Sequence, residues 1–358
     1  MPFRLPDLTD DARYLAAPDE LPKYLSAVAV IPARDEARRV VTCLEGLRCQ
    51  WNPQFGSMHQ QVAAVLVVNG TRDATAFEAM KWQAIHPTFA LFIVDVQFAR
   101  DKAHVGSARR LGLDVAAALL EQTVAEAGLL FSTDADSRLA PTALSIGIQE
   151  LSRADAFGAH IVAGEEDTSV IGLTMNRYNE LKAQLRFRHY RSAHERHPQH
   201  GVFGGAGFGV SLHAYRAVGG LPQLAYDEDQ EMRRRLLGQG FRVSYPKDIV
   251  VYTSTRTTGR TPWGMAKQLE AWERDAERNA WPEEYCAEGL VEKYDAKART
   301  RNAWAVTNSN EAFEQYWQRE WHRLMEGRPQ PTPKVPLPEA VASLEVYLAR
   351  SPQARSAQ

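Results

Sequence analysis

Short apolar runs alternate with segments of helical periodicity over the first two-thirds of the chain. The runs that read as strands are residues 24–31, 62–68, 89–94 and 128–133, and the segments with apolar residues at helical spacing are 35–47, 74–84 and 107–121. Strand and helix in this alternation predict an α/β fold, with a mostly parallel sheet and helices on both faces. Ligands of such sheets bind beyond the carboxyl ends of the strands.

The alternation loosens in the second half of the chain. We expect a strand at 156–162, a basic, aromatic-rich helix at 176–194, a glycine-rich loop at 201–209, helices at 214–218 and 228–237, and strands at 241–245 and 249–252. Beyond Pro262 the pattern changes to long polar helices with many tryptophans. The predicted organisation is an N-terminal extension (1–23), an α/β domain (24–260), a helical C-terminal region (261–350) and a disordered tail (351–358).

Composition narrows the class of protein. The 358 residues are 44% hydrophobic and 24% charged, with Lys+Arg 42 against Asp+Glu 44, so nothing favours a nucleic-acid partner. Three cysteines form no CxxC pair, which fits a reducing compartment. The first twenty residues have no apolar core, and no run approaches the roughly 18 apolar residues of a membrane span. We expect a cytoplasmic protein without a transmembrane segment, and peripheral membrane contact stays open.

The strongest chemical signal is a pair of aspartates at the end of an apolar run. Asp134 and Asp136 follow the strand predicted at 128–133, which delivers two carboxylates to one strand end. Hard oxygen ligands suit Mg²⁺ or Mn²⁺, and such ions commonly take substrate phosphates as further ligands. The alternative is a solvated turn, in which aspartate is also common.

Four segments in order resemble the family 2 glycosyltransferases of the GT-A fold. They are VIPARDE at 30–36, VLVVNGTRDAT at 65–75, TDADS at 133–137, and GGLP at 219–222 followed by EDQEM at 228–232. The resemblance covers about residues 24–260 and implies a GT-A type, Rossmann-like sheet followed by a helical C-terminal extension. It also implies metal-dependent transfer of a sugar from a nucleoside diphosphate sugar, with a UDP-sugar as first expectation, to an unidentified acceptor hydroxyl with inversion.

The resemblance assigns the nucleotide to the first, second and third segments. The expected contacts are Pro32, Arg34, Glu36, Asn69, Lys102, Arg109 and Asp134. Backbone N–H groups after the first strand can meet the nucleotide, although a plain helix start explains the acidic residues there equally well. Val68 stands where the family carries an acidic residue, and Asn69 can donate to or accept from a base.

The resemblance divides the chemistry between two acidic pairs. Asp136 is expected to bind the metal that bridges the two phosphates, with Asp134 near the ribose or the metal. Asp229 is expected to act as general base beside Glu228 at a helix start, where the dipole favours a carboxylate; the alternative is simple capping around Asp227. Glycines 204, 205 and 207 suggest a backbone packed close to a sugar.

The region after residue 252 bears on the acceptor. Arg256 and Arg260 are candidates to hold a diphosphate or an acidic acceptor, and the metal-binding histidine of many relatives is absent from 252–260. Residues 268–272 (QLEAW) lack the arginine of the processive signature, which favours single transfer.

Two other functions stay open. A sugar-phosphate nucleotidyltransferase shares the parallel sheet and the acidic metal site, but it needs a glycine-rich, basic phosphate loop after the first strand, where this chain has ARDE at 33–36. A non-catalytic, nucleotide-binding relative is the other alternative, and the absent histidine is compatible with it.

Overall fold

The computed structural model describes residues 4–9, 11–123, 128–163, 170–191, 195, 197–254, 270–271, 274–275, 278, 280–305, 313–326 and 334–350. The chain divides into two compact units, one of Met1–Val162 with Val202–Ser254 and one of Ala163–Gly201 with Thr255–Gln358. The second unit thus combines an internal segment with the C-terminal helices. The domain boundaries given above stay a prediction.

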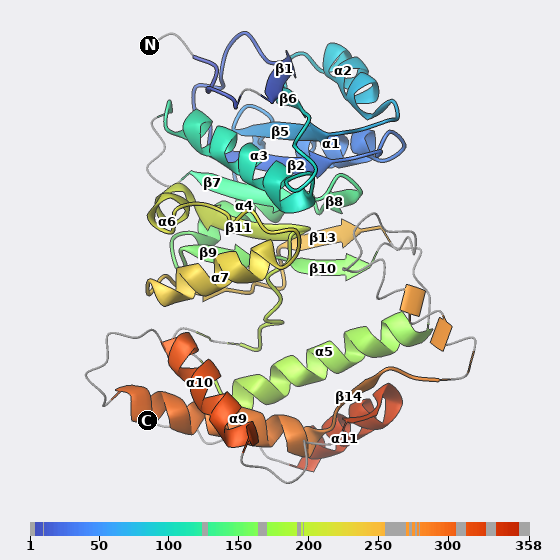
Figure 1. Cartoon of the computed structure of the whole chain (residues 1–358), viewed down its shortest axis with the longest axis vertical. Coiled ribbons are helices and arrows are strands. Elements are labelled where there is room, and N and C mark those ends of the chain that lie inside the picture. The colour runs from blue at the N-terminus through green and yellow to red at the C-terminus, as the bar shows by residue number, and fades with distance from the viewer. Residues whose placement is uncertain are drawn as a thin grey trace. The chain divides into compact units, whose positions relative to one another are not determined.

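The first unit is built on an eight-stranded sheet (Figure 1). In spatial order its strands are β1 (Ala12–Ala16), β6 (Ala90–Val96), β5 (Val62–Asn69), β2 (Ala27–Ala33), β7 (Leu129–Thr133), β11 (Gly207–Ser211), β9 (Ala156–Gly158) and β12 (Val243–Ser244). The pairs β2–β5, β5–β6, β2–β7 and β9–β12 are parallel, whereas β1 and β11 run antiparallel to their neighbours. The predicted mostly parallel α/β sheet is confirmed.

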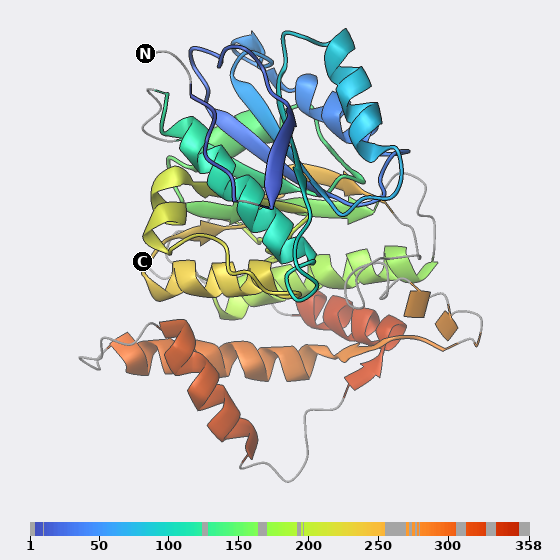
Figure 2. The ribbon, with the colours of Figure 1, turned by 45° about the horizontal axis from the view of Figure 1, so that its top comes forward.

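Helices cover both faces of this sheet, as Figures 1 and 2 show. One core contains side chains of α3 (Val105–Leu120), α6 (Leu212–Ala217) and α7 (Glu228–Gly238), and the other contains those of α1 (Val40–Arg48), α2 (Thr75–Ile85) and α4 (Ala143–Glu150). Every residue of β2 and β5 is buried. A strand covered on both faces has no polar side, which explains its continuous apolar run.

Short strands complete the first unit. A three-stranded sheet has the order β10 (His160–Ala163), β13 (Val250–Thr253), β8 (Ser137–Leu139), and β3 (Trp51–Asn52) pairs with β4 (Gly56–Ser57). In the register of β8 with β13, Ser137 faces Thr253, and their hydroxyls are hydrogen-bonded at 3.0 Å. The turn that contains Asp136 is thereby anchored on its C-terminal side.

The second unit has its own apolar core. Its elements are α5 (Val170–His189), β14 (Glu283–Tyr285), α9 (Ala287–Ala305), α10 (Phe313–Glu326), β15 (Lys334–Pro336) and α11 (Leu337–Arg350). The helix predicted at 176–194 is thus α5, which begins at Val170 and ends at His189. Among the described residues, no helix combines the length and apolar character that crossing a bilayer requires.

The prediction of a glycine-rich loop at 201–209 is wrong for residues 207–209. Gly207–Ser211 forms β11, which lies between β7 and β9 inside the sheet. Glycine is disfavoured in strands, so the residues gave no strand signal. Gly209 lies opposite Phe157 of β9, and a Cβ at Gly209 would overlap the Phe157 ring. The ring occupies the space that a side chain would fill.

We expect Gly209→Ala to destabilise the protein by about 1–3 kcal/mol, because the added methyl group overpacks against Phe157. Chemical denaturation of Gly209→Ala, Phe157→Leu and the double variant measures the coupling, which should be about 1 kcal/mol or more in favour of the double variant. Gly46→Ala in α1 is the control, because a Cβ there would lie at least 3.0 Å from its nearest neighbours, Arg138 and Leu139 of β8, whereas a Cβ at Gly209 would lie 2.2 Å from the Phe157 ring. Additive effects at 157 and 209 would contradict this packing account.

Candidate active site

The candidate site lies where the order of the strands reverses. The chain proceeds from β2 outward through β5 to β6 and then returns to β7 on the other side of β2. The β2–β7 ladder ends at the pair Val30–Ser132, before Pro32, which has no N–H to donate. The segments that follow β2 and β7 therefore leave the sheet side by side, at the point where α/β sheets bind ligands.

The loop after β2 is hydrogen-bonded to the segment after β5. The amides of residues 35, 36 and 37 donate to Thr71 Oγ1, Thr75 Oγ1 and Asp73 Oδ2 at 3.2, 2.7 and 3.0 Å. Asp35 has a φ of 53° and accepts a hydrogen bond from the Arg72 amide at 2.7 Å. The expectation that these amides meet a nucleotide is not supported, because they are already bonded within the protein.

Three carboxylates of the site raise the pKa of one buried thiol, that of Cys43. Cys43 lies on α1, and its Sγ is 3.5 Å from the carbonyl oxygen of Asp134. Burial raises the pKa of the Cys43 thiol, and the charges of Asp136, Asp134 and Glu36 raise it further. The acids predicted after β2 and after β7 therefore share one region. Thr133 Oγ1 is also buried, with no hydrogen-bond partner among the described residues.

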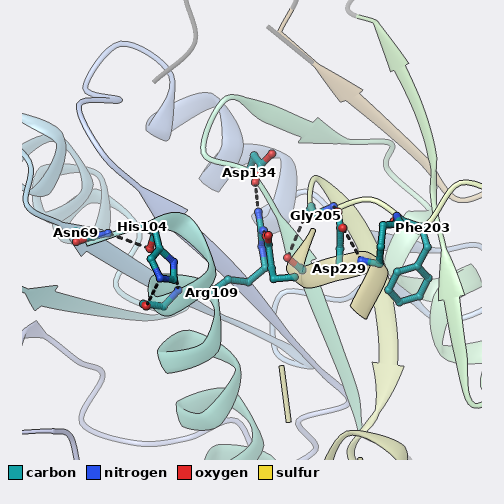
Figure 3. Close-up of polar contacts among 11 residues, drawn as sticks. Asn69, His104, Arg109, Asp134, Phe203, Gly205 and Asp229 are labelled. Carbon is teal, nitrogen blue, oxygen red and sulfur yellow. Dashed lines mark hydrogen bonds and ion pairs between the residues drawn. The ribbon is translucent and has the colours of Figure 1, made fainter. Parts of the chain in front are cut away.

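Arg109 connects this acidic region to the start of α7. Its side chain is 3% exposed, Nη2 lies 2.6 Å from Asp134 Oδ1, and Nη1 forms an ion pair with Glu228 (Figure 3). Burial opposes the charge of Arg109, but Glu228, Asp134 and Asp229 outweigh it and raise its pKa. The guanidinium predicted to touch a phosphate is thus engaged by two carboxylates of the protein, one of which, Glu228, was predicted to be catalytic.

Asp229 is held by the backbone on two sides. Its Oδ2 accepts from the Gly205 amide at 2.7 Å and its Oδ1 from the Gln230 amide at 2.6 Å. The Gln230 side chain donates to the carbonyl of Phe203, which ties α7 to the segment before β11 (Figure 3). Asp227 occupies the N-cap position with a φ of 57°, and its side chain makes no capping hydrogen bond. Capping by the Asp227 side chain is therefore not its role.

Asp229 is the more basic type of carboxylate that proton abstraction needs. Burial raises the pKa of Asp229, and the charge of Glu228 raises it further. Arg109 and the hydrogen bonds from Gly205 and Gln230 oppose the rise without cancelling it. A raised pKa increases the driving force for accepting a proton.

The remaining predicted nucleotide contacts lie along the same edge of the sheet. Asn69 is buried at the end of β5 and its Nδ2 donates to the carbonyl of His104 at 3.4 Å. His104 caps α3 by accepting from the Ser107 amide, and burial lowers its pKa, partly opposed by Asp101. Lys102 is exposed in the loop before α3, and Arg34 is exposed after β2.

The roles of two residues in this arrangement differ from what the sequence predicts. The sequence analysis assigns no role to His104, although a histidine three positions before a helical serine is compatible with a cap. Gly205 was expected to face a sugar, but a Cβ there would lie 2.6–2.8 Å from the Arg109 guanidinium. Arg256 and Arg260 lie outside the described residues. Within the described ranges, no three His, Cys, Asp or Glu residues form a group that could hold a metal alone.

Comparisons with known proteins find similar solved structures but no match by sequence. No family model matches the chain, and no curated protein matches it by sequence. Among solved structures, the chain is similar to the mannosyltransferase PcManGT from Pyrobaculum calidifontis in complex with GDP-Man and Mn²⁺, at 18% identity and a TM-score of 0.49, covering 95% of this chain and 79% of that chain.

Two further solved structures are similar over most of this chain. TarS 1-349 of S. aureus in complex with UDP-GlcNAc shares 14% identity at a TM-score of 0.47, covering 85% of this chain and 82% of that chain. GalNAc-T7 with UDP, GalNAc and Mn²⁺ shares 11% identity at a TM-score of 0.49, covering 86% and 59%.

The raised pKa of Asp229 predicts a pH-dependent effect of Asp229→Asn on stability. The folded protein holds a proton on Asp229 more tightly than the unfolded chain does, so this group contributes stability at low pH that is lost as pH rises through its folded pKa. The free energy of unfolding of Asp229→Asn should therefore increase relative to that of wild type as the pH rises from about 4 to about 7, the range in which a carboxyl with a raised pKa loses its proton. Urea denaturation across this range measures the difference, and a constant difference would contradict the shift.

Proposed function

We propose that this protein is a metal-dependent glycosyltransferase that moves a sugar from a nucleoside diphosphate sugar to an acceptor hydroxyl. The observation that carries the proposal is one connected network that joins Asp134 after β7 to Glu228 and Asp229 at the start of α7 through Arg109 and Gly205. Two of the four motifs of the sequence resemblance, those at 133–137 and 228–232, supply the acidic members of this network. A donor-binding acid and a basic carboxylate thus belong to one site.

The residues after β7 fit a divalent cation. Asp136 and Asp134 offer hard carboxylate oxygens in a region where Glu36 adds a third negative charge. Asp136 is the proposed principal ligand, as the sequence resemblance implies. When bound there, Mn²⁺ or Mg²⁺ supplies positive charge that offsets the charge developing on the departing diphosphate.

Asp229 supports a direct displacement at the anomeric carbon. In the proposed step Asp229 takes the proton of the acceptor hydroxyl while the acceptor oxygen bonds to the anomeric carbon. The bond from that carbon to the diphosphate oxygen breaks, and its electron pair leaves with the nucleoside diphosphate. A single displacement inverts the anomeric configuration. Raised basicity and two backbone hydrogen bonds equip Asp229 for this role.

The other predicted contacts belong to the donor side of the proposal. Asn69 and Pro32 lie at the carboxyl ends of β5 and β2 and are proposed to border the base and ribose. Lys102 and Arg34 are exposed and are proposed to approach the nucleotide. Arg256 and Arg260 are proposed to hold the diphosphate or an acidic acceptor. Single transfer, rather than polymer extension, rests on the sequence at 268–272.

The loop after β2 disfavours the nucleotidyltransferase alternative. A triphosphate-binding loop needs amides that point to the ligand, but those of residues 35–37 donate to side chains of the loop after β5. Pyrophosphate release from UTP or GTP with a sugar phosphate would support that alternative. Absence of Mn²⁺-dependent nucleotide binding would support a non-catalytic relative with a different ligand.

Two substitutions separate binding from chemistry. We expect Asp136→Ala to abolish the Mn²⁺-dependent part of UDP or GDP binding in calorimetry, because the principal metal carboxylate is removed. We expect Asp229→Asn to keep that binding and to lower the release of UDP or GDP from UDP-N-acetylglucosamine or GDP-mannose by roughly 100- to 10,000-fold, the usual contribution of a general base.

Asp155→Asn is the matched control, because Asp155 lies before β9 and accepts from the Arg242 amide away from this network. It should bind and react like wild type. If Asp136→Ala and Asp229→Asn both behave like the control, or if both lose nucleotide binding equally, the assignment of metal ligand and base is wrong.

A further inference from the structure

Arg109, which is buried, and Gly205, which is half-buried, lie in contact between the two acidic halves of the site, Asp134 and the pair Glu228–Asp229. A Cβ at Gly205 would lie 2.6–2.8 Å from three guanidinium atoms of Arg109, so only a glycine lets the guanidinium lie against this backbone. The Gly205 amide donates to Asp229 Oδ2 at 2.7 Å, and its carbonyl accepts from Ser132 Oγ at 2.9 Å. The peptide that holds Asp229 is therefore fixed by β7 on one side and by Arg109 on its Cα.

We propose that Arg109 is a positioning residue that, through Gly205 and Glu228, sets the orientation of Asp229 relative to Asp134. This inference rests on the proposed function and assigns Arg109 a role different from the phosphate contact expected from the sequence. The guanidinium bridges two carboxylates. One of its nitrogens pairs with Asp134 after β7, and another pairs with Glu228 of α7.

The charges around Arg109 give this role an energetic basis. Glu228 is 4% exposed, and an unpaired carboxylate at such burial is strongly destabilised. Asp134 is more exposed than Glu228, so the pair with Asp134 can be exchanged for other partners at lower cost. Arg109 thus stays with Glu228, and the start of α7 keeps its place while ligands engage Asp134.

A lysine at position 109 cannot reproduce this arrangement. Lysine carries one ammonium group, which lacks the planar fork that spans two carboxylates from different elements. It also lacks the flat surface that lies against Gly205. Arg109→Lys therefore keeps the charge and changes the geometry, whereas Gly205→Ala keeps the arginine and displaces its guanidinium from the other side.

The test compares Arg109→Lys and Gly205→Ala with wild type in three measurements. In both variants we expect exchange of the backbone amide hydrogen of residue 205, followed by NMR and corrected for the intrinsic rate of the residue present, to be faster by about tenfold or more, because the bond to Asp229 is weakened. Binding of UDP and GDP with Mn²⁺ should stay within about threefold of wild type. Release of UDP or GDP from UDP-N-acetylglucosamine or GDP-mannose should fall by about 100-fold, the cost of a misplaced catalytic group.

Arg216→Lys is the control, because Arg216 forms a half-exposed ion pair with Glu121 and should leave all three measurements unchanged. Two results would overturn the proposal. One is an unchanged exchange rate of the amide hydrogen of residue 205 in both test variants. The other is a nucleotide affinity that falls as far as turnover, which would make Arg109 a direct phosphate ligand. If wild type neither binds UDP or GDP with Mn²⁺ nor turns over a donor, the proposed function fails, while the exchange measurement still decides whether Arg109 positions Asp229.

Discussion

The buried ion pairs of Arg109 are the interaction on which the candidate site depends. A single guanidinium, 3% exposed, meets Asp134 from the end of β7 and Glu228 from the start of α7. Breaking such a buried pair leaves an uncompensated carboxylate, so each element constrains the other. The site is consequently a joint property of α3, β7 and α7, and no one of these elements carries it alone.

The topology of the sheet brings the segments that carry these residues to one edge. Because the strand order reverses between β2 and β7, the polar segments after both strands emerge at one edge. The antiparallel β11 pairs with β7 so that Gly207 lies opposite Thr133, and the glycine-rich segment before β11 therefore reaches the same edge. A parallel strand in that place would carry its preceding segment to the opposite end of the sheet.

The sequence alone predicts those elements of the fold that have a strong hydrophobic pattern. The apolar runs at 62–68 and 128–133 correspond to β5 and β7, because strands buried on both faces need apolar residues throughout. β11 was missed because its glycines match space filled by Phe157, which is a tertiary effect. Motifs single out Asp134, Asp136 and Asp229, whose roles stay predictions, but no motif indicates the pairing of Arg109 with Glu228. Those two residues are 119 positions apart, and nothing local in the chain distinguishes Arg109 from the exposed basic residues near it.

The balance of charge at the site explains how one arginine can serve both halves. Three carboxylates raise the pKa of Arg109, so the guanidinium remains charged despite its burial. They are those of Glu228, Asp134 and Asp229. One cation does not neutralise three anions, and Glu36 and Asp136 add further negative charge beside Cys43. A region with this excess favours a divalent cation over an additional anion. Asp229 is more basic than an ordinary aspartate for a different reason, which is its burial and, after that, the charge of Glu228. Arg109 opposes this rise in the pKa of Asp229 while it pairs with Asp134, so one guanidinium acts on both halves of the site.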